Sequence, residues 1–137
     1  MSPVTASTVA CQEECFARAF GSSDLEIARR LYHPEVVYLS PTIRLFGWPA
    51  RIEGVDRTLE FIGVTIKGLE EVRYRAVENA IVPNADAAFV RIHFDWTMES
   101  VRLRCNYVVI YRYRDGLIGQ QELYYDPSGQ LEVLSSS

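Results

Sequence analysis

Residues 87–98 read AAFVRIHFDWTM, and their alternation of apolar and polar side chains decides the kind of fold. Alternation with a period of two is typical of a β-strand that buries one face. The buried face is predicted to carry Ala88, Val90, Ile92, Phe94 and Trp96. Further strands are predicted at 70–82, 101–113 and 117–126, with turn signals between them. The second half of the chain is therefore predicted to form an antiparallel sheet.

The first half of the chain is predicted to be mainly helical. Apolar residues recur at helical spacing in 8–20 and again in 55–67. Between them, the capping-box pattern Ser23-Asp24-Leu25-Glu26 predicts a short helix that Pro34 ends. One strand is predicted at 35–40, and a long loop at 41–54 with a short strand near 43–46. Helices followed by antiparallel strands predict an α+β fold.

Length and composition limit the classes of protein that this chain can be. Its 137 residues predict one domain, 1–137, with loose termini at 1–7 and 128–137. The net charge of −4 does not favour a nucleic-acid partner, and no apolar run approaches the ~18 residues of a membrane span. Residues 1–10 do not resemble a secretory signal, so we expect a cytoplasmic protein. Neither zinc-binding spacings nor glycine-rich phosphate loops occur, so we expect no metal and no other cofactor.

Three patches of the sequence resemble the nuclear transport factor 2-like superfamily. They are Asp24–Pro41 (DLEIARRLYHPEVVYLSP), Gly54-Val55-Asp56, and Arg112–Pro127 (RYRDGLIGQQELYYDP). This superfamily includes ketosteroid isomerases, limonene-epoxide hydrolases, scytalone dehydratases and SnoaL-type polyketide cyclases. The resemblance implies a cone-shaped, curved antiparallel sheet wrapped around the N-terminal helices, with an internal apolar pocket. It implies much less about function, because one fold hosts many chemistries.

The resemblance also places the catalytic positions of two relatives on residues of unsuitable chemistry. The ketosteroid-isomerase base would fall at Ser40, its phenol at Phe16 and its carboxylic acid at Val109. Neither Phe16 nor Val109 has an ionisable proton, and a serine without help is a poor base. The charged groups of an epoxide hydrolase would fall at Leu123, Phe94 and Ile92. We therefore expect neither of these two mechanisms.

The register of the last hairpin decides which of its side chains face the pocket. If 114–116 forms a three-residue loop, Val109 lies opposite Gln121. The residues facing the pocket are then Gln121, Leu123 and Tyr125. If residues 115 and 116 alone form a two-residue turn, Glu122 becomes a base in the pocket and Asp126 its partner. A slip of one residue exchanges the two faces, and we predict the first register because it agrees with the resemblance.

In the predicted register, the catalytic candidates are donors that would polarise a carbonyl: Tyr107, Gln121 and Tyr32. The other residues predicted to line the pocket are Phe16, Tyr38, Ser40, Trp48, Leu59, Val90, Ile92, Phe94, Val109, Leu123 and Tyr125. An alternative cluster on the opposite face of the sheet comprises His93, Asp95 and Arg104. The simpler interpretation of that cluster is a row of cross-strand pairs that faces solvent or a second copy of the chain.

These observations predict a cofactor-independent isomerase, cyclase or dehydratase. Its expected substrate is an apolar polyketide, terpenoid or steroid-like small molecule of secondary metabolism, which a chamber lined by phenols would hold in a reactive shape. Two alternatives stay open. The first alternative to an enzyme is a non-catalytic carrier of such a molecule, and the second is a dimeric interaction module. A homodimer is the expected assembly.

Overall fold

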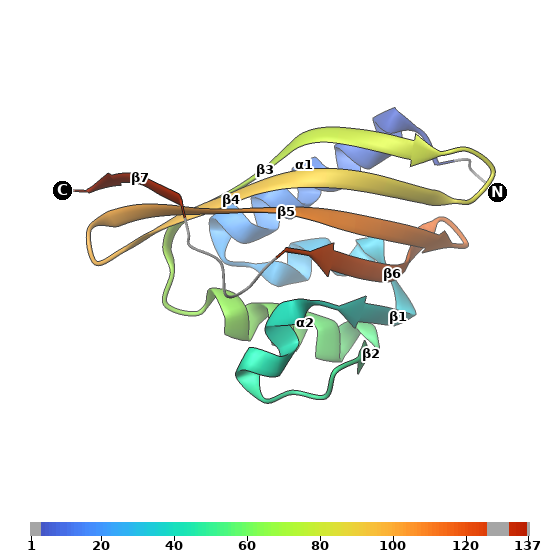
Figure 1. Cartoon of the computed structure of the whole chain (residues 1–137). Helices are drawn as coiled ribbons and strands as arrows, with labels where there is room; N and C mark the ends of the chain where they lie inside the picture. The colour runs from blue at the N-terminus through green and yellow to red at the C-terminus, as the bar shows by residue number, and fades with distance from the viewer. Residues whose placement is uncertain (1–3, 126–131, 137) are drawn as a thin grey trace.

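Helices and strands in the computed structural model are described for residues 4–125 and 132–136 (Figure 1). In chain order they are α1 (Ala6–Ser22), the 3-10 helix η1 (Leu25–Leu31), β1 (Tyr32–Leu39), the 3-10 helix η2 (Pro41–Phe46), β2 (Ile52–Glu53), α2 (Val55–Ile66), β3 (Glu70–Val82), β4 (Ala87–Met98), β5 (Val101–Arg114), β6 (Leu117–Tyr124) and β7 (Glu132–Ser136). The helices at the start and the curved sheet after them confirm the predicted α+β fold. Over these residues, no helix is both long enough and apolar enough to cross a membrane.

Local capping explains where the first two helices begin and end. At the start of α1, the Thr5 hydroxyl accepts a hydrogen bond from the Thr8 backbone N–H at 3.1 Å. Ser23 has a φ of 57° and ends α1, so it is not the N-cap that the sequence predicts for the next helix. That role belongs to Asp24, whose carboxylate accepts from the Glu26 N–H at 3.2 Å. The short helix that Asp24 caps is the 3-10 helix η1.

The strands form one mixed sheet in the order β2-β1-β6-β5-β4-β3. The pairing of β1 with β6 is parallel, and the other pairings are antiparallel. Helix α1 packs against β3 and helix α2 against β1, so the two helices cover different parts of the sheet (Figure 1). The core between these layers includes the fully buried side chains Val36, Phe61, Ile92 and Tyr111. This arrangement leaves the middle of the sheet free to form the wall of a cavity.

The hairpin between β5 and β6 differs from both registers considered above. Asp115 and Gly116 have φ values of 54° and 79°, so they form a two-residue primed turn that pairs Arg114 with Leu117. The predicted three-residue loop is wrong. Gly119 then adds one residue to β6 and forms a β-bulge, where a Cβ would lie 3.0 Å from the Arg114 Cβ.

The bulge moves the pairing by one residue. Val109 consequently pairs with Leu123, and Tyr111 with Gln121. Gln121 is 7% exposed and faces inward, whereas Glu122 lies on the other face of β6, where Arg112 of β5 contacts it. The structure therefore reaches the predicted inward face by combining the turn of the alternative register with a bulge that neither register contained.

Three further segments differ from the sequence expectations. Residues 41–46 form η2 instead of a strand near 43–46, and the short strand of this loop is β2. Residues 132–136 form β7, which pairs with β5 at Val101–Arg104, so this part of the C-terminus is not loose. Likewise α1 begins at Ala6, inside the N-terminal segment expected to be loose. Residues 1–3, 126–131 and 137 lie outside the described part of the chain.

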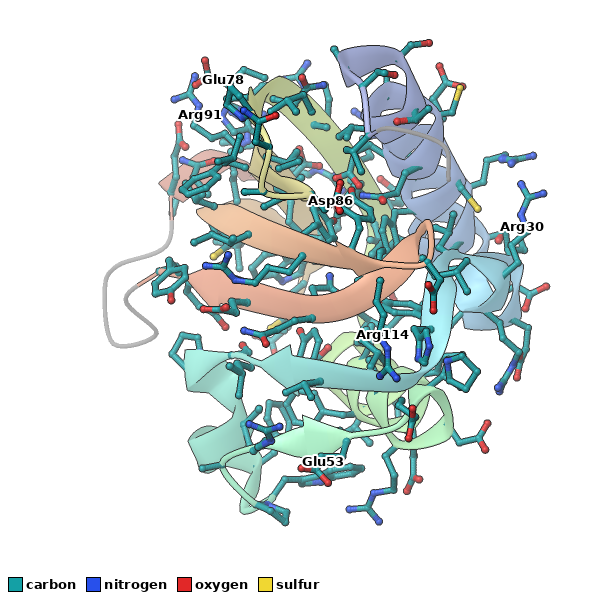
Figure 2. The ribbon with its side chains drawn as sticks, turned by 90° about the vertical axis from the view of Figure 1, so that its right-hand side faces the viewer. Arg30, Glu53, Glu78, Asp86, Arg91 and Arg114 are labelled. Atoms are coloured by element: carbon teal, nitrogen blue, oxygen red, sulfur yellow. The ribbon has the colours of Figure 1, made fainter. Side chains whose placement is uncertain are left out.

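Ion pairs between exposed side chains occupy the outer face of the sheet and its edges (Figure 2). Arg91 of β4 contacts Glu78 of β3 at 2.8 Å, and Arg114 of β5 contacts Glu35 of β1 at 3.2 Å. All four side chains are more than half exposed, so these pairs add little to the free energy of unfolding. The polar side of the sheet is thus the side away from the helices.

Candidate functional site

A cavity of about 450 Å³ lies between the sheet and the helices. Of the sixteen described residues that line it, ten are aromatic and none carries a carboxylate or a positive charge, so an apolar ligand suits it best. The lining residues are Phe16, Phe20, Tyr32, Tyr38, Phe46, Ile62, Thr65, Ile66, Leu69, Tyr74, Phe94, Trp96, Cys105, Tyr107, Gln121 and Tyr125. We call this space the aromatic cavity.

Tyr32 and Gln121 form a hydrogen-bonded pair in the wall of the aromatic cavity. Parallel pairing of β1 with β6 brings the two residues together, and the Tyr32 hydroxyl donates to Gln121 Oε1 at 2.6 Å. Burial raises the pKa of Tyr32 well above its ordinary value, so the phenol stays neutral. With its oxygen occupied by Tyr32, Gln121 has its amide NH₂ left to donate, and no described residue accepts from it.

Three other tyrosines of the cavity differ in how their hydroxyls are bonded. Tyr38 and Tyr125 are both hydrogen-bonded to Ser40, and burial raises the pKa of each phenol. Burial also raises the pKa of Tyr107 well above its ordinary value. Within residues 4–125 and 132–136, however, the Tyr107 hydroxyl has no hydrogen-bond partner. Tyr107 is therefore a neutral phenol that is free to donate to a ligand.

A buried carboxylate lies beneath the aromatic cavity. Glu13 of α1 is 4% exposed, and Tyr74, which lines the cavity, donates to its Oε1 at 2.6 Å. Tyr111 donates to Oε2 at 3.1 Å and the Gln12 amide to the same oxygen at 3.1 Å. Burial raises the pKa of Glu13, and the three hydrogen bonds oppose that effect in part.

Glu13 is not among the residues predicted from the sequence to form the site. Its spacing already indicated burial, because it follows Val9 by four residues and precedes Phe16 by three, on the apolar stripe. A carboxylate at that position is buried, and it needs partners such as Tyr74 and Tyr111.

The structure brings together some of the predicted site residues and separates others. All three catalytic candidates line the aromatic cavity, as do Phe16, Tyr38, Phe94 and Tyr125. Four predicted lining residues are instead core side chains that do not reach it: Leu59, Val90, Ile92 and Val109. Ser40 and Leu123 line a second groove beside Glu122. Trp48 packs edge-on against Phe61, with their ring centroids 5.2 Å apart, and anchors its loop.

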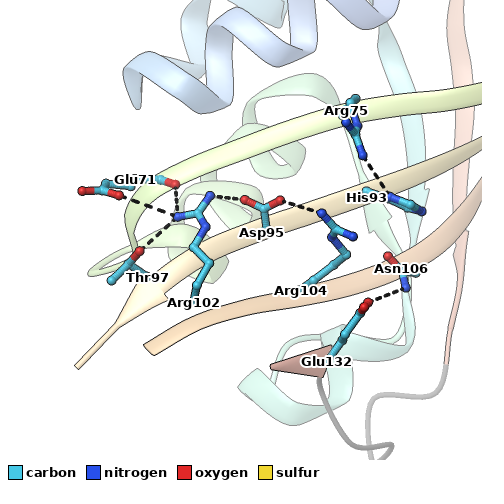
Figure 3. Close-up of polar contacts among 9 residues, drawn as sticks. All are labelled: Glu71, Arg75, His93, Asp95, Thr97, Arg102, Arg104, Asn106 and Glu132. Atoms are coloured by element: carbon cyan, nitrogen blue, oxygen red, sulfur yellow. Dashed lines mark hydrogen bonds and ion pairs between the residues drawn. The ribbon is translucent and has the colours of Figure 1, made fainter. Parts of the chain in front are cut away.

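The described residues of the two alternative clusters do not face the aromatic cavity. In the first, hydrogen bonds from Tyr124 and Gln120 lower the pKa of Glu122, so it stays ionised on the outer face. Its proposed partner Asp126 lies outside the described residues. The second cluster, His93, Asp95 and Arg104, occupies the face of β4 and β5 opposite Phe94 and Cys105 (Figure 3). There Arg104 contacts Asp95 at 3.5 Å.

Replacing Glu122 with glutamine is expected to leave ligand affinity unchanged, because its side chain points away from the aromatic cavity. Replacing the preceding residue, Gln121→Leu, should change the affinity, because it removes a donor from the wall. The two variants are compared by titrating the apolar dye Nile red, and the ketone 4-acetylbiphenyl as a competitor. A loss of ketone affinity in Glu122→Gln alone would mean that the other face of β6 is the functional one.

The SnoaL-like domain model matches residues 13–120 of this chain. A protein with a ketosteroid isomerase-like fold from Catenulispora acidiphila, in complex with trimethylamine, has a TM-score of 0.70 at 15% identity, over 91% of this chain and 89% of that one. An LEH-like epoxide hydrolase from Mycobacterium tuberculosis has a TM-score of 0.62 at 17% identity, over 85% and 80%. TerC, co-crystallised with polyporic acid, has a TM-score of 0.70 at 19% identity, over 85% and 90%.

Identities this low show a shared fold only, and no curated protein matches the sequence. The family model is the stronger finding, because it extends from Glu13 in α1 to Gln120 in β6 and so includes most of the residues around the aromatic cavity. It also agrees with the superfamily that the sequence patches resemble. The chain belongs to the SnoaL-like domain family, within the nuclear transport factor 2-like superfamily.

Proposed function

We propose that the protein is a cofactor-independent isomerase, cyclase or dehydratase acting on an apolar polyketide, terpenoid or steroid-like molecule that carries a carbonyl group. The observation that supports this most directly is the pair of unoccupied donors, the Tyr107 hydroxyl and the Gln121 amide, in a mostly aromatic and apolar wall. An apolar molecule with an oxygen acceptor fits such a wall better than a hydrocarbon or a charged metabolite does.

The donors would act on charge that develops at the carbonyl oxygen. In a cyclisation, an enol carbon of the substrate would attack the carbonyl carbon and the C=O electron pair would move to the oxygen, where Tyr107 and Gln121 would stabilise the charge by hydrogen bonding until the enol proton passes to that oxygen. Tyr32 holds Gln121 Oε1 at 2.6 Å and so keeps the amide NH₂ directed elsewhere. Contact with the aromatic walls would hold a flexible substrate in a folded shape.

The double change Tyr107→Phe and Gln121→Leu is expected to lower kcat/KM by about 100-fold or more, because it removes both donors to the developing oxyanion. The measurement is turnover of a panel of apolar β-diketones and α,β-unsaturated ketones, followed by liquid chromatography and mass spectrometry. Tyr124→Phe is the matched control, because this tyrosine donates to Glu122 on the outer face. Unchanged turnover in the double variant would rule out the mechanism.

A non-catalytic carrier is the second candidate, and one observation favours it. None of the described lining residues is an acid, an imidazole or an amine that could accept a substrate proton directly. Native mass spectrometry of protein incubated with the same ketone panel separates the two functions. Recovery of unchanged ketone supports a carrier, and recovery of an isomer or a dehydrated product supports an enzyme.

The expected homodimer and cytoplasmic location stay predictions.

A further inference from the structure

Glu13 is a buried carboxylate that the mechanism above does not use. Its oxygens accept hydrogen bonds from Tyr74, Tyr111 and Gln12. In the part of the chain that the structure describes, it forms no ion pair with an arginine, lysine or histidine. Burial raises the pKa of Glu13, which makes its carboxylate a stronger base than one in water. A base therefore lies just behind the wall of a cavity whose described lining contains none.

Tyr74 connects the aromatic cavity to this carboxylate. Among the described residues that line the cavity, Tyr74 alone is hydrogen-bonded to Glu13. Its hydroxyl donates to Glu13 Oε1 at 2.6 Å, a short O–H···O distance typical of a carboxylate acceptor. Its ring stacks on that of Phe20, another lining residue, with the ring centroids 5.0 Å apart. A proton can thus pass from the cavity to Glu13 through a single side chain.

The oxygen of Tyr74 is also an acceptor that the protein leaves open. A phenol donates one proton and can accept a hydrogen bond through the same oxygen. The proton of Tyr111 goes to Glu13 Oε2 at 3.1 Å, because the Tyr74 oxygen is farther away, at 3.5 Å. No other described residue donates to Tyr74. The wall therefore combines two donors, Tyr107 and Gln121, with one acceptor, so a ligand with both a carbonyl and an O–H group matches it.

Glu13 also lines a groove of about 390 Å³ between α1 and β3, which we call the α1–β3 groove. The exposed residues Glu78 and Asn79 line the same groove, so it opens to solvent. Tyr74 lines both the groove and the aromatic cavity. A proton that reaches Glu13 can consequently leave to water without passing back through the ligand.

We propose that Tyr74 accepts the enol O–H proton of an enolised β-diketone substrate and passes its own proton to Glu13. This inference rests on the proposed function, and it names the substrate class and the proton acceptor of that reaction. Tyr74 is the residue that touches the substrate, and Glu13 acts through it.

Atoms and electrons balance in this step. The enol O–H bond breaks, its proton bonds to the Tyr74 oxygen, and the former Tyr74 proton bonds to Glu13 Oε1. The electron pair left on the enol oxygen forms a C=O bond, and the C=C pair forms the new bond to the attacked carbonyl carbon. The C=O pair of that carbonyl moves to its oxygen, which Tyr107 and Gln121 would hold. This oxyanion takes a proton from water as the product leaves, and Glu13 releases its proton into the α1–β3 groove.

Two matched probes separate the enol proton from the shape of the ligand. Dibenzoylmethane is largely an enol, and its analogue with two methyl groups on the central carbon cannot enolise. Displacement of Nile red gives their dissociation constants. Tyr74→Phe is expected to weaken dibenzoylmethane about tenfold, the effect of one hydrogen bond, and to leave the dimethyl analogue unchanged. Glu13→Gln should alter both affinities much less, because glutamine keeps an oxygen acceptor for the Tyr74 hydroxyl.

The absorption spectrum of bound dibenzoylmethane shows where its proton goes, since an enolate absorbs at longer wavelength than its enol. At a pH where free dibenzoylmethane is neutral, we expect the unmodified protein to give part of the enolate band, and Glu13→Gln and Tyr74→Phe to give none. The matched controls are Glu122→Gln and Tyr124→Phe, because the Tyr124 hydroxyl donates to Glu122 at the same 2.6 Å on the outer face. Both controls should keep the band.

Dibenzoylmethane that binds the unmodified protein without this band would show that no proton reaches Glu13. The same holds for a band that persists in Glu13→Gln. In either case the inference is wrong while the ligand cavity stands. Failure of both probes to bind the unmodified protein would overturn the proposed function, and this inference with it.

Discussion

Replacing Glu13 with glutamine is expected to make the free energy of unfolding less sensitive to pH. Burial raises the pKa of Glu13 in the folded protein above 4.5, the ordinary value that applies in the unfolded chain. Between these two pKa values, the folded state holds a proton that the unfolded state has lost. The contribution of Glu13 to stability is therefore fully present below pH 4.5 and is lost as pH rises through its folded-state pKa.

Glutamine cannot lose a proton in this range, so Glu13→Gln lacks this decrease. As pH rises from 4.5 to 8, the unmodified protein should lose stability relative to Glu13→Gln. The loss in unfolding free energy should be about 1.4 kcal/mol for each unit by which the pKa of Glu13 is raised. Urea denaturation at a series of pH values measures it. Glu14→Gln, which alters an exposed carboxylate on the next residue, is the matched control. Parallel pH profiles for Glu13→Gln and the unmodified protein would show that Glu13 does not titrate in this range.

Glu13→Leu tests the hydrogen bonds of Glu13 separately from its protonation. Leucine leaves the Tyr74 and Tyr111 hydroxyls and the Gln12 amide without their acceptor in a buried site. Each unsatisfied donor costs about 1–3 kcal/mol, so this variant should be much less stable than Glu13→Gln at every pH. Equal stability of the two variants would mean that the tyrosines find other acceptors.

Replacing Asp95 with alanine is expected to lower the free energy of unfolding by about 3–5 kcal/mol, although Asp95 lies on the face of β4 opposite the aromatic cavity. Arg102 and Arg104 both contact its carboxylate, and all three side chains are about four-fifths buried or more (Figure 3). Without Asp95, the two guanidinium groups are left close together without their shared anion. Arg102 then keeps two neutral acceptors, Thr97 Oγ1 at 3.0 Å and the Glu71 carbonyl at 2.7 Å, and a distant ion pair with the exposed Glu71 carboxylate at 4.0 Å.

Glu78→Ala is the matched control for this variant. Its ion pair with Arg91 joins neighbouring strands on the same outer face, but both side chains are more than half exposed. Water screens such pairs, and their loss costs about 1 kcal/mol or less. Urea denaturation of both variants gives the comparison. A similar loss in both would contradict the view that burial makes the Asp95 cluster structural, and a loss of ketone turnover in folded Asp95→Asn would restore the catalytic alternative.

The main elements could be predicted from the sequence because their signals are local. The alternation in 87–98 matches β4 residue for residue, and the predicted strand 70–82 matches β3. Glu99 and Ser100 lie between two segments of alternating polarity, which indicates a two-residue turn. Such a turn pairs Asp95 with Arg104, as the structure shows. Helix 8–20 was predicted two residues too short at each end, because capping by Thr5 and the left-handed Ser23 depends on side-chain geometry.

Several errors in the candidate site have one cause, the interior geometry of the cone. Val90, Ile92 and Val109 are on the predicted face, but that face changes along its length from packed core to cavity wall. Periodicity reports which face a side chain occupies and not how far the opposite layer lies from it. Only the placement of α1 and α2 over the sheet separates the two regions.

The amino-acid sequence alone determined the α+β order of elements, the family, and an interior rich in aromatic side chains. Tertiary structure decided the final register of β6, the burial of Glu13, and which donors of the cavity are left without a partner. The physical reason is the separation along the chain of the residues that interact. Helical and strand periods arise from backbone geometry between near neighbours, whereas the Glu13 hydrogen bonds join residues 61 and 98 positions apart. Only when distant segments pack together are such groups paired, or left free to bind a ligand.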